Sequence, residues 1–183
     1  VRRALDESEL PPRVFHPTHV NRRKALFDEA LELAMRGCTI DLTAFPVEEG
    51  EDAWSAADAL LRYLDSAAPA ERITISSDAG GCLPVFDGEG HVCRMGVGES
   101  GALLETLNQV LARGVPLERA LPAFTRNPAR LLRLAAKGRI AAGADADLLV
   151  LDEAGRAQHV IARGVVHVRD GAILRYGSFE HIT

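Results

Sequence analysis

The segment RITISSDA, residues 72–79, decides the fold class, because its β-branched and apolar residues end in a Ser-Ser-Asp run and a glycine-rich stretch. A short run of this kind predicts a buried strand. Two similar segments lie upstream, CTIDLTAF at residues 38–45 and RVFHPTHV at residues 13–20. In the second, Pro17 has to lie at the end of the strand, because proline cannot donate to a ladder of hydrogen bonds.

Helical periodicity fills the intervals between these segments. Apolar residues recur at helical spacing over about 22–36, 54–67 and 99–113, and Gly37 and Gly114 are expected to end the first and third helices. Strand and helix thus alternate three times at intervals of about 30 residues, which is typical of βα units on a parallel sheet. The apolar character of the strands predicts a sheet covered on both sides.

The pattern changes towards the carboxyl end. PLERALPAF and NPARLLRLA predict two short helices, the second with Asn127 as its N-cap and Pro128 at its first position. DADLLVLD, QHVIARG and VVHVRDGAILRYG then predict short strands, with a hairpin turn at Asp170–Gly171. The sequence therefore divides into an α/β segment, residues 1–136, and a small β element, residues 137–183.

Composition excludes several classes of partner. The 183 residues carry a formal net charge of −5 and no basic tract, so we expect no nucleic acid and no membrane surface as partners, and a small-molecule substrate instead. The three cysteines, Cys38, Cys82 and Cys93, show no CxxC spacing. They fit a reducing compartment, which predicts a cytoplasmic protein.

Polar side chains cluster where the three expected strands end. His19 follows the first strand, Asp41 and Thr43 lie in or near the end of the second, and Ser76, Ser77 and Asp78 follow the third. In parallel α/β folds these ends carry the binding and catalytic groups. Histidine and aspartate suit a metal, although a catalytic zinc usually has three protein ligands. The alternatives are a histidine satisfied by backbone groups and an aspartate that forms a turn.

Two further histidines and one loop complete the features of note. His16 lies an odd number of residues from His19, so on a strand the two side chains would point to opposite faces, which predicts a packing role for His16. His91 is expected in a solvated loop. The glycine-rich stretch from Ala79 to Gly98 is a candidate lid.

The runs PTHVNR, TIDLT, SSD and GRIAAGADADLLVLD resemble the amidohydrolase superfamily, and most closely its β-aspartyl (isoaspartyl) dipeptidases. The resemblance extends from about Arg13 to Phe179. It implies the carboxy-terminal part of a metal-dependent (β/α)8 TIM barrel, with the last three βα units in residues 1–136, followed by strands of a small β-sandwich in residues 137–183.

The resemblance also implies a binuclear zinc site and a role for individual residues. His19 is then a ligand of the second metal, and Asp78 touches the first metal and serves as general base and acid. Arg22 lies where the family binds the free carboxylate of the departing amino acid. Cys82 lies near the position of a serine close to the aspartyl end of the substrate, and a thiol is a poorer hydrogen-bond partner than a hydroxyl. A metal-activated water would attack the amide carbonyl.

The family requires more metal ligands than this sequence contains. The HxH pair, the bridging lysine and a further histidine are expected upstream of residue 1, so the sequence indicates a carboxy-terminal half that is inactive alone. The family favours a homo-oligomer. Two alternatives stay open: another amidohydrolase, either dihydroorotase-like or acting on N-acyl amino acids, or a half-domain that has lost catalysis.

Overall fold

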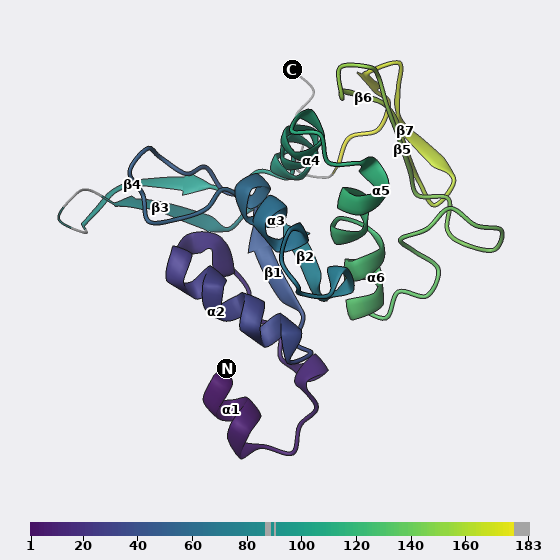
Figure 1. Cartoon of the computed structure of the whole chain (residues 1–183). Helices are drawn as coiled ribbons and strands as arrows, with labels where there is room; N and C mark the ends of the chain where they lie inside the picture. Colours follow the sequence, from purple (N-terminus) through teal and green to yellow (C-terminus); the bar gives the residue numbers. More distant parts are fainter. Residues whose placement is uncertain (87–88, 90, 178–183) are drawn as a thin grey trace.

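Two parallel strands form the centre of the molecule (Figure 1). β1 (Ile40–Thr43) pairs with β2 (Ile73–Ser76), with Ile40 opposite Ile73 and Thr43 opposite Ser76. The computed structural model describes residues 1–86, 89 and 91–177. The helices α2 (Lys24–Met35) and α3 (Ala56–Leu64) alternate with these strands, which confirms the predicted α/β order.

The two faces of this strand pair differ in polarity. Ile40 and Leu42 of β1 belong to the hydrophobic core together with Ile73 and Ile75 of β2. Successive side chains of a strand point to opposite faces, so the other face carries the buried or half-buried polar set Asp41, Thr43, Thr74 and Ser76. Both faces of the strand pair are covered, as predicted, but one of them is polar and not apolar.

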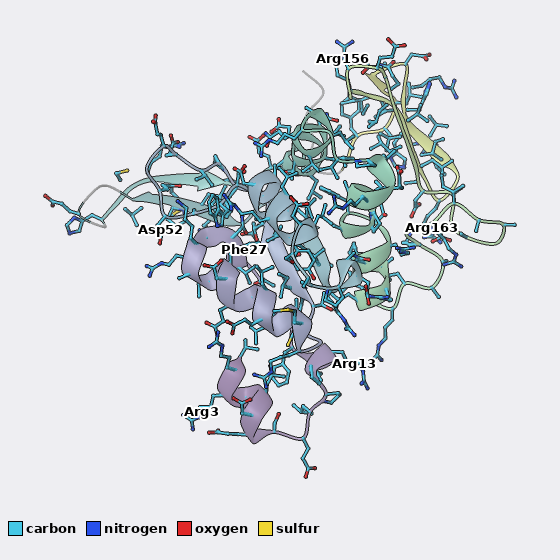
Figure 2. All side chains as sticks on the ribbon, in the orientation of Figure 1. Arg3, Arg13, Phe27, Asp52, Arg156 and Arg163 are labelled. Carbon is cyan, nitrogen blue, oxygen red and sulfur yellow. The ribbon has the colours of Figure 1, made fainter. Side chains whose placement is uncertain are left out.

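The core fills the space between the strands and the helices. Phe27 of α2, Leu60 and Tyr63 of α3, and Val110 of α4 (Ala102–Ala112) are almost completely buried there. Figure 2 labels Phe27 where α2 meets the packed centre. The hydroxyl of Tyr63 donates a hydrogen bond to the carbonyl oxygen of Pro69 at 2.8 Å, so even this buried polar atom is satisfied.

The segment before α2 contains no hydrogen-bonded strand, contrary to the prediction for residues 13–20. It consists of two 3-10 turns, η1 (Pro12–Val14) and η2 (Val20–Arg22), joined by extended backbone. One backbone hydrogen bond links the extended part to β1, from the amide of Asp41 to the carbonyl oxygen of Pro17 at 3.0 Å. Because Pro17 has no amide hydrogen, it cannot return a bond to the neighbouring strand.

The glycine-rich stretch after β2, which is the candidate lid, contains an antiparallel hairpin that the sequence did not predict. β3 (Cys82–Phe86) pairs with β4 (Val92–Val97), and Cys82 lies opposite Val97. Residues 87, 88 and 90 of the expected lid lie outside the described part. The hairpin projects from the end of the central strands (Figure 1).

Short helices connect this α/β region to the carboxy-terminal part. They are α5 (Leu117–Ala120), η4 (Leu121–Ala123) and α6 (Arg126–Leu131). Asn127 is not the N-cap of α6, as predicted, because Thr125 takes that position. The side-chain amide of the buried Asn127 donates instead to the carbonyl oxygens of Ala70 and Ile73.

The last part is a four-stranded antiparallel sheet in the order β5-β6-β7-β8. Its strands are β5 (Leu148–Leu151), β6 (Ala157–Ala162), β7 (Val165–Arg169) and β8 (Ala172–Ile173). Asp170 and Gly171, with φ of 51° and 75°, form the predicted hairpin turn. The predicted element 137–183 thus contains this sheet, while residues 178–183 lie outside the description.

Two further elements complete the described chain, α1 (Arg2–Glu7) and η3 (Ala70–Arg72). α1 lies at one end of the molecule, away from the carboxy-terminal sheet (Figure 1). The labelled Arg3 and Arg13 project at the same end (Figure 2). In the part of the chain that the structure describes, no helix has the length and apolar character needed to cross a membrane.

Candidate functional site

His19 and Asp78 face one another at the carboxyl ends of the central strands. The Nε2 atom of His19 lies 4.0 Å from the Oδ2 atom of Asp78, and the side chains are 40% and 34% exposed. Both residues adopt left-handed backbone conformations, with φ of 56° and 50°. This conformation costs a non-glycine residue about 1 kcal/mol. Two residues from distant parts of the sequence therefore adopt strained conformations at one rim of the molecule, which is typical of functional sites.

Thr43 orients the imidazole of His19. Its Oγ1 atom lies 2.9 Å from Nδ1 of His19. A ring nitrogen that binds a metal needs its lone pair, so the other nitrogen carries the hydrogen and donates it to a partner. The contact with Thr43 supplies such a partner and leaves Nε2 available towards Asp78. Among the described residues no group of three or more histidine, cysteine or acidic side chains could hold a metal ion, so no third such side chain joins His19 and Asp78 there.

Two glycines make room for Asp78. The amide of Gly81 donates to the carbonyl oxygen of Asp78 at 2.9 Å, and a Cβ atom on Gly81 would lie 2.6 Å from the Oδ1 atom of Asp78. A Cβ atom on Gly98 would overlap the carbonyl oxygen of Asp78. From the sequence, both glycines belong to the candidate lid. Gly81 lies directly behind the Ser-Ser-Asp run, and this position was the available signal for its close approach to Asp78.

Arg22 follows His19 by one turn of η2. Its amide donates to the carbonyl oxygen of His19 at 3.1 Å, and its guanidinium lies 4.9 Å from the centre of the Phe45 ring. Within the described part of the chain no carboxylate forms an ion pair with Arg22. Arg22 and Phe45 line a cavity of about 340 Å³ together with Arg94 of the hairpin. An arginine held by an aromatic ring at the wall of a cavity is suited to binding a carboxylate.

Asn21 fixes the turn that carries His19 and Arg22. Its side chain is fully buried and accepts from the amide of Thr43 at 2.9 Å. It also donates to the carbonyl oxygens of Thr43 and Trp54 at 3.0 and 2.9 Å. Asn21 has no role that the sequence could predict, because a lone asparagine before a helix does not indicate three simultaneous contacts with the backbone.

Asp41 occupies the polar face of the strand pair and is 4% exposed. Its carboxylate accepts from the hydroxyl of Thr74 at 2.6 Å and from the hydroxyl of Ser76 at 2.5 Å. The Nε2 atom of His16 lies 3.3 Å from Oγ1 of Thr74. Burial lowers the pKa of His16 below its ordinary value, and the Asp41 carboxylate partly offsets this effect. His16 is therefore a member of a buried hydrogen-bonded chain.

Cys82 belongs to the β3–β4 hairpin, and His91 directly precedes β4. Cys82 is the exposed first residue of β3, and Cys93 is exposed in β4. His91 is exposed next to β4, and its Nδ1 atom lies 3.7 Å from a carboxylate oxygen of Glu89. Burial raises the pKa of the Cys38 thiol, which suits a packing residue.

Known proteins resemble this chain in both sequence and structure. Residues 14–169 match the model of the amidohydrolase family. A deacetylase of Agrobacterium fabrum is 30% identical over 149 residues, which cover 73% of this chain and 36% of that protein. A β-aspartyl dipeptidase of Fervidobacterium islandicum, solved in complex with a β-Asp-Leu dipeptide, is 36% identical with a TM-score of 0.84.

Each match covers a larger share of this chain than of the protein that it resembles. The dipeptidase match covers 96% of this chain but 44% of the dipeptidase, so this chain spans less than half of either relative. An N-acetylglucosamine-6-phosphate deacetylase of Thermotoga maritima is 19% identical with a TM-score of 0.50. The match covers 78% of this chain and 50% of the deacetylase, and at this identity it shows a similar fold alone. With a family model that matches most of its length, this chain belongs to the amidohydrolase family.

Proposed function

We propose that this chain carries part of the active site of a metal-dependent hydrolase that cleaves the isopeptide bond of β-aspartyl dipeptides. The observation that carries the proposal is the approach of His19 Nε2 to Asp78 Oδ2, with the Arg22 cation one turn beyond His19. The 36% identity to a dipeptidase that holds β-Asp-Leu supports this substrate class.

His19 and Asp78 fit the metal ligands expected of such an enzyme. His19 serves as ligand of a second metal and Asp78 as ligand of a first, and zinc suits imidazole and carboxylate donors. When bound, the ions activate water and polarise the amide carbonyl. Asp78 accepts the proton of the attacking water at a carboxylate oxygen and later donates it to the nitrogen of the leaving amine.

Arg22 holds the substrate in register for this reaction. Its planar guanidinium offers paired donors to the free carboxylate of the departing amino acid, and Phe45 keeps it at the wall of the cavity. Cys82 lies near the aspartyl end of the substrate, where its thiol bonds more weakly than a hydroxyl would. Cys82 therefore adjusts specificity without taking part in the proton transfers.

The proposal includes an architecture beyond the described strands. Residues 1–136 supply the last three βα units of a TIM barrel, and residues 137–183 supply strands of a β-sandwich. Because His19 and Asp78 are too few to hold two ions, further ligands come from outside this chain, which is inactive by itself. We further propose a cytoplasmic homo-oligomer.

A second candidate is the hydrolysis of another amide by the same residues. The deacetylase of Agrobacterium fabrum favours it, because that protein is 30% identical to this chain. Where the leaving amine of such an amide has no neighbouring carboxylate, Arg22 would make no contribution to substrate binding.

Activity of the complete gene product on two substrates separates the candidates. β-Asp-Leu and an N-acetyl amine without a carboxylate are compared in the wild type and in Arg22→Met. The dipeptidase proposal expects a KM for β-Asp-Leu raised about tenfold to hundredfold, with any hydrolysis of the simple amide unchanged. Arg23→Met, at an exposed neighbour that also lines the cavity, is the matched control.

Loss of both activities to the same degree in Arg22→Met contradicts dipeptide recognition by this residue. Zinc content tests the metal ligands separately. His19→Asn and Asp78→Asn should each lower the zinc bound per protein, measured by elemental analysis. A folded wild-type protein that binds no metal would overturn both candidates and leave a half-domain without catalysis.

A further inference from the structure

The buried carboxylate of Asp41 has no role in the proposed reaction. It lies in the middle of β1, on the same face as Thr43, two residues before the threonine that contacts His19. Its two oxygens are each engaged by one hydroxyl of β2, from Thr74 and from Ser76. Burying a carboxylate is costly, and a charged acceptor with two short hydroxyl bonds offsets part of that cost.

The direction of these bonds follows from counting hydrogens. Thr74 has one hydroxyl hydrogen, and its 2.6 Å contact with Asp41 is far shorter than its 3.4 Å contact with the carbonyl oxygen of Ile40. The hydrogen therefore points to Asp41, and the oxygen of Thr74 accepts from Nε2–H of His16. The chain runs from His16 through Thr74 to Asp41, and Ser76 donates to Asp41 from the other side.

Ser76 is the point where this network meets the candidate site. It is the last residue of β2 and lies two residues before Asp78. Asp41 holds its hydroxyl, while the amide of Ala44 holds its carbonyl oxygen at 2.8 Å. The backbone beyond Ser76 turns into the left-handed conformation of Asp78. Because both the side chain and the carbonyl group of Ser76 are hydrogen-bonded, the position at which this turn begins is fixed.

We propose that Asp41 is a positioning residue, which sets the end of β2 through Ser76 and so fixes the carboxylate of Asp78 opposite His19. Thr43, two residues further along the same face of β1, orients His19. β1 therefore positions both His19 and Asp78, although it supplies no group that would touch the metal or the substrate. The kinetic consequences of this role rest on the proposed function, whereas the position of Asp78 can be measured without it.

The test uses Ser76→Ala, Ser76→Thr and Asp41→Asn in the complete gene product. Ser76→Ala removes the hydroxyl, and Ser76→Thr keeps it. We expect kcat on β-Asp-Leu to fall about tenfold to hundredfold in Ser76→Ala and in Asp41→Asn, because a displaced catalytic group costs that much. KM should stay close to the wild type. Both variants weaken the hydrogen bonding of a buried side chain, so their melting temperatures should fall, and Ser76→Thr should restore both kcat and the melting temperature.

The double variant Asp41→Asn/Ser76→Ala should lose no more activity than the worse single variant, because both changes break the same contact. Additive losses, or an unchanged kcat in Ser76→Ala, would overturn the role. A second measurement does not need activity: crystal structures of the wild type and Ser76→Ala should show Asp78 moved away from His19. An unmoved Asp78 overturns the proposal even if the protein hydrolyses no β-aspartyl dipeptide, and inactivity of the wild type alone counts only against the proposed function.

Discussion

At the scale of single residues, the site depends on close approaches that only glycine permits. Gly81 lies so near Asp78 that an added Cβ atom would meet both the Oδ1 and the Oδ2 atoms of its carboxylate, at 2.6 and 2.8 Å. Gly81 itself has no positive φ that would strain another residue. Glycine is therefore needed at position 81 to leave room for the Asp78 carboxylate, and not because of the backbone conformation of Gly81.

Gly81→Ala is expected to displace the Asp78 carboxylate and lower the turnover of the complete enzyme about tenfold to hundredfold. Steady-state kinetics on β-Asp-Leu measure the loss. Gly101→Ala is the matched control, because φ at Gly101 is −60° and a Cβ atom added there would meet no other atom within 4 Å. Equal kinetics in both variants would mean that the added methyl group at position 81 does not impair the function of Asp78.

The half-buried His16 should make stability depend on pH. Its pKa is lowered in the folded state from the ordinary value of 6.5, mainly by burial. Below pH 6.5 the unfolded chain therefore binds more protons than the folded chain, so the free energy of unfolding falls as the pH drops towards the lowered pKa. Above pH 6.5 the contribution of His16 to stability is fully present.

Urea unfolding above and below pH 6.5 tests this in the wild type and in His16→Gln. Glutamine keeps a donor for Thr74 but does not titrate, so the acid-induced loss of stability should be smaller in the variant. The same pH dependence in both proteins would exclude His16 as a source of the effect.

At the scale of elements, the sequence predicted the regular units well and the irregular ones poorly. The strands β1 and β2 and the helices α2, α3 and α4 were predicted because apolar periodicity and ending glycines act within a few residues. The strand predicted around Pro17 is absent, because an extended segment becomes a strand only through partners that the local sequence does not reveal. The hairpin of β3 and β4 was missed because its glycines were interpreted as a loop.

In the candidate site, too, some residues could be predicted from the sequence and others could not. His19 and Asp78 were selected because polar residues at the ends of parallel strands meet at one rim, and the structure brings them within 4.0 Å. Asn21 and the contacts of Asp41 could not be predicted, because each depends on an atom from a distant segment. Their roles appear only when distances across the fold are known.

Asn21 joins three elements of the fold, so its replacement should destabilise the molecule. Asn21→Ala removes two donors and one acceptor that satisfy buried backbone groups of Thr43 and Trp54. We expect a loss of about 3 kcal/mol in the free energy of unfolding, measured by urea denaturation. Asn108→Ala, which removes a single bond to the carbonyl oxygen of Gly155, should cost about 1 kcal/mol. Equal losses would show that the two extra contacts of Asn21 contribute nothing.

At the scale of the whole molecule, the central sheet has only two strands in the described chain. Its outer edges are partly satisfied within the chain, because the amides of Asp41 and Thr43 donate to Pro17 and Asn21. Large apolar side chains are exposed, including Val97, Leu132 and Ile140 at 64%, 65% and 89%. Residues 1–183 therefore present surfaces suited to further protein contacts.

Expressed by itself as residues 1–183, the chain is expected to self-associate, because its large exposed apolar side chains stay uncovered. Size-exclusion chromatography with light scattering measures the state. The complete gene product, purified in the same buffer, serves as the control and should elute as one defined species. A monodisperse monomer of residues 1–183 would contradict the expectation and show that the two-stranded sheet is sufficient for a stable fold.

The residues proposed for catalysis and the β3–β4 hairpin that lines the cavity lie on different elements, which matters for protein engineering. His19 and Asp78 are fixed by β1, β2 and two glycines, whereas Leu83 and Arg94 of the hairpin form the far wall of the cavity beside Arg22. Changes on this wall need not disturb the residues proposed for catalysis. Libraries restricted to the hairpin should therefore alter which dipeptides are accepted, and laboratory evolution of new substrate ranges can begin there.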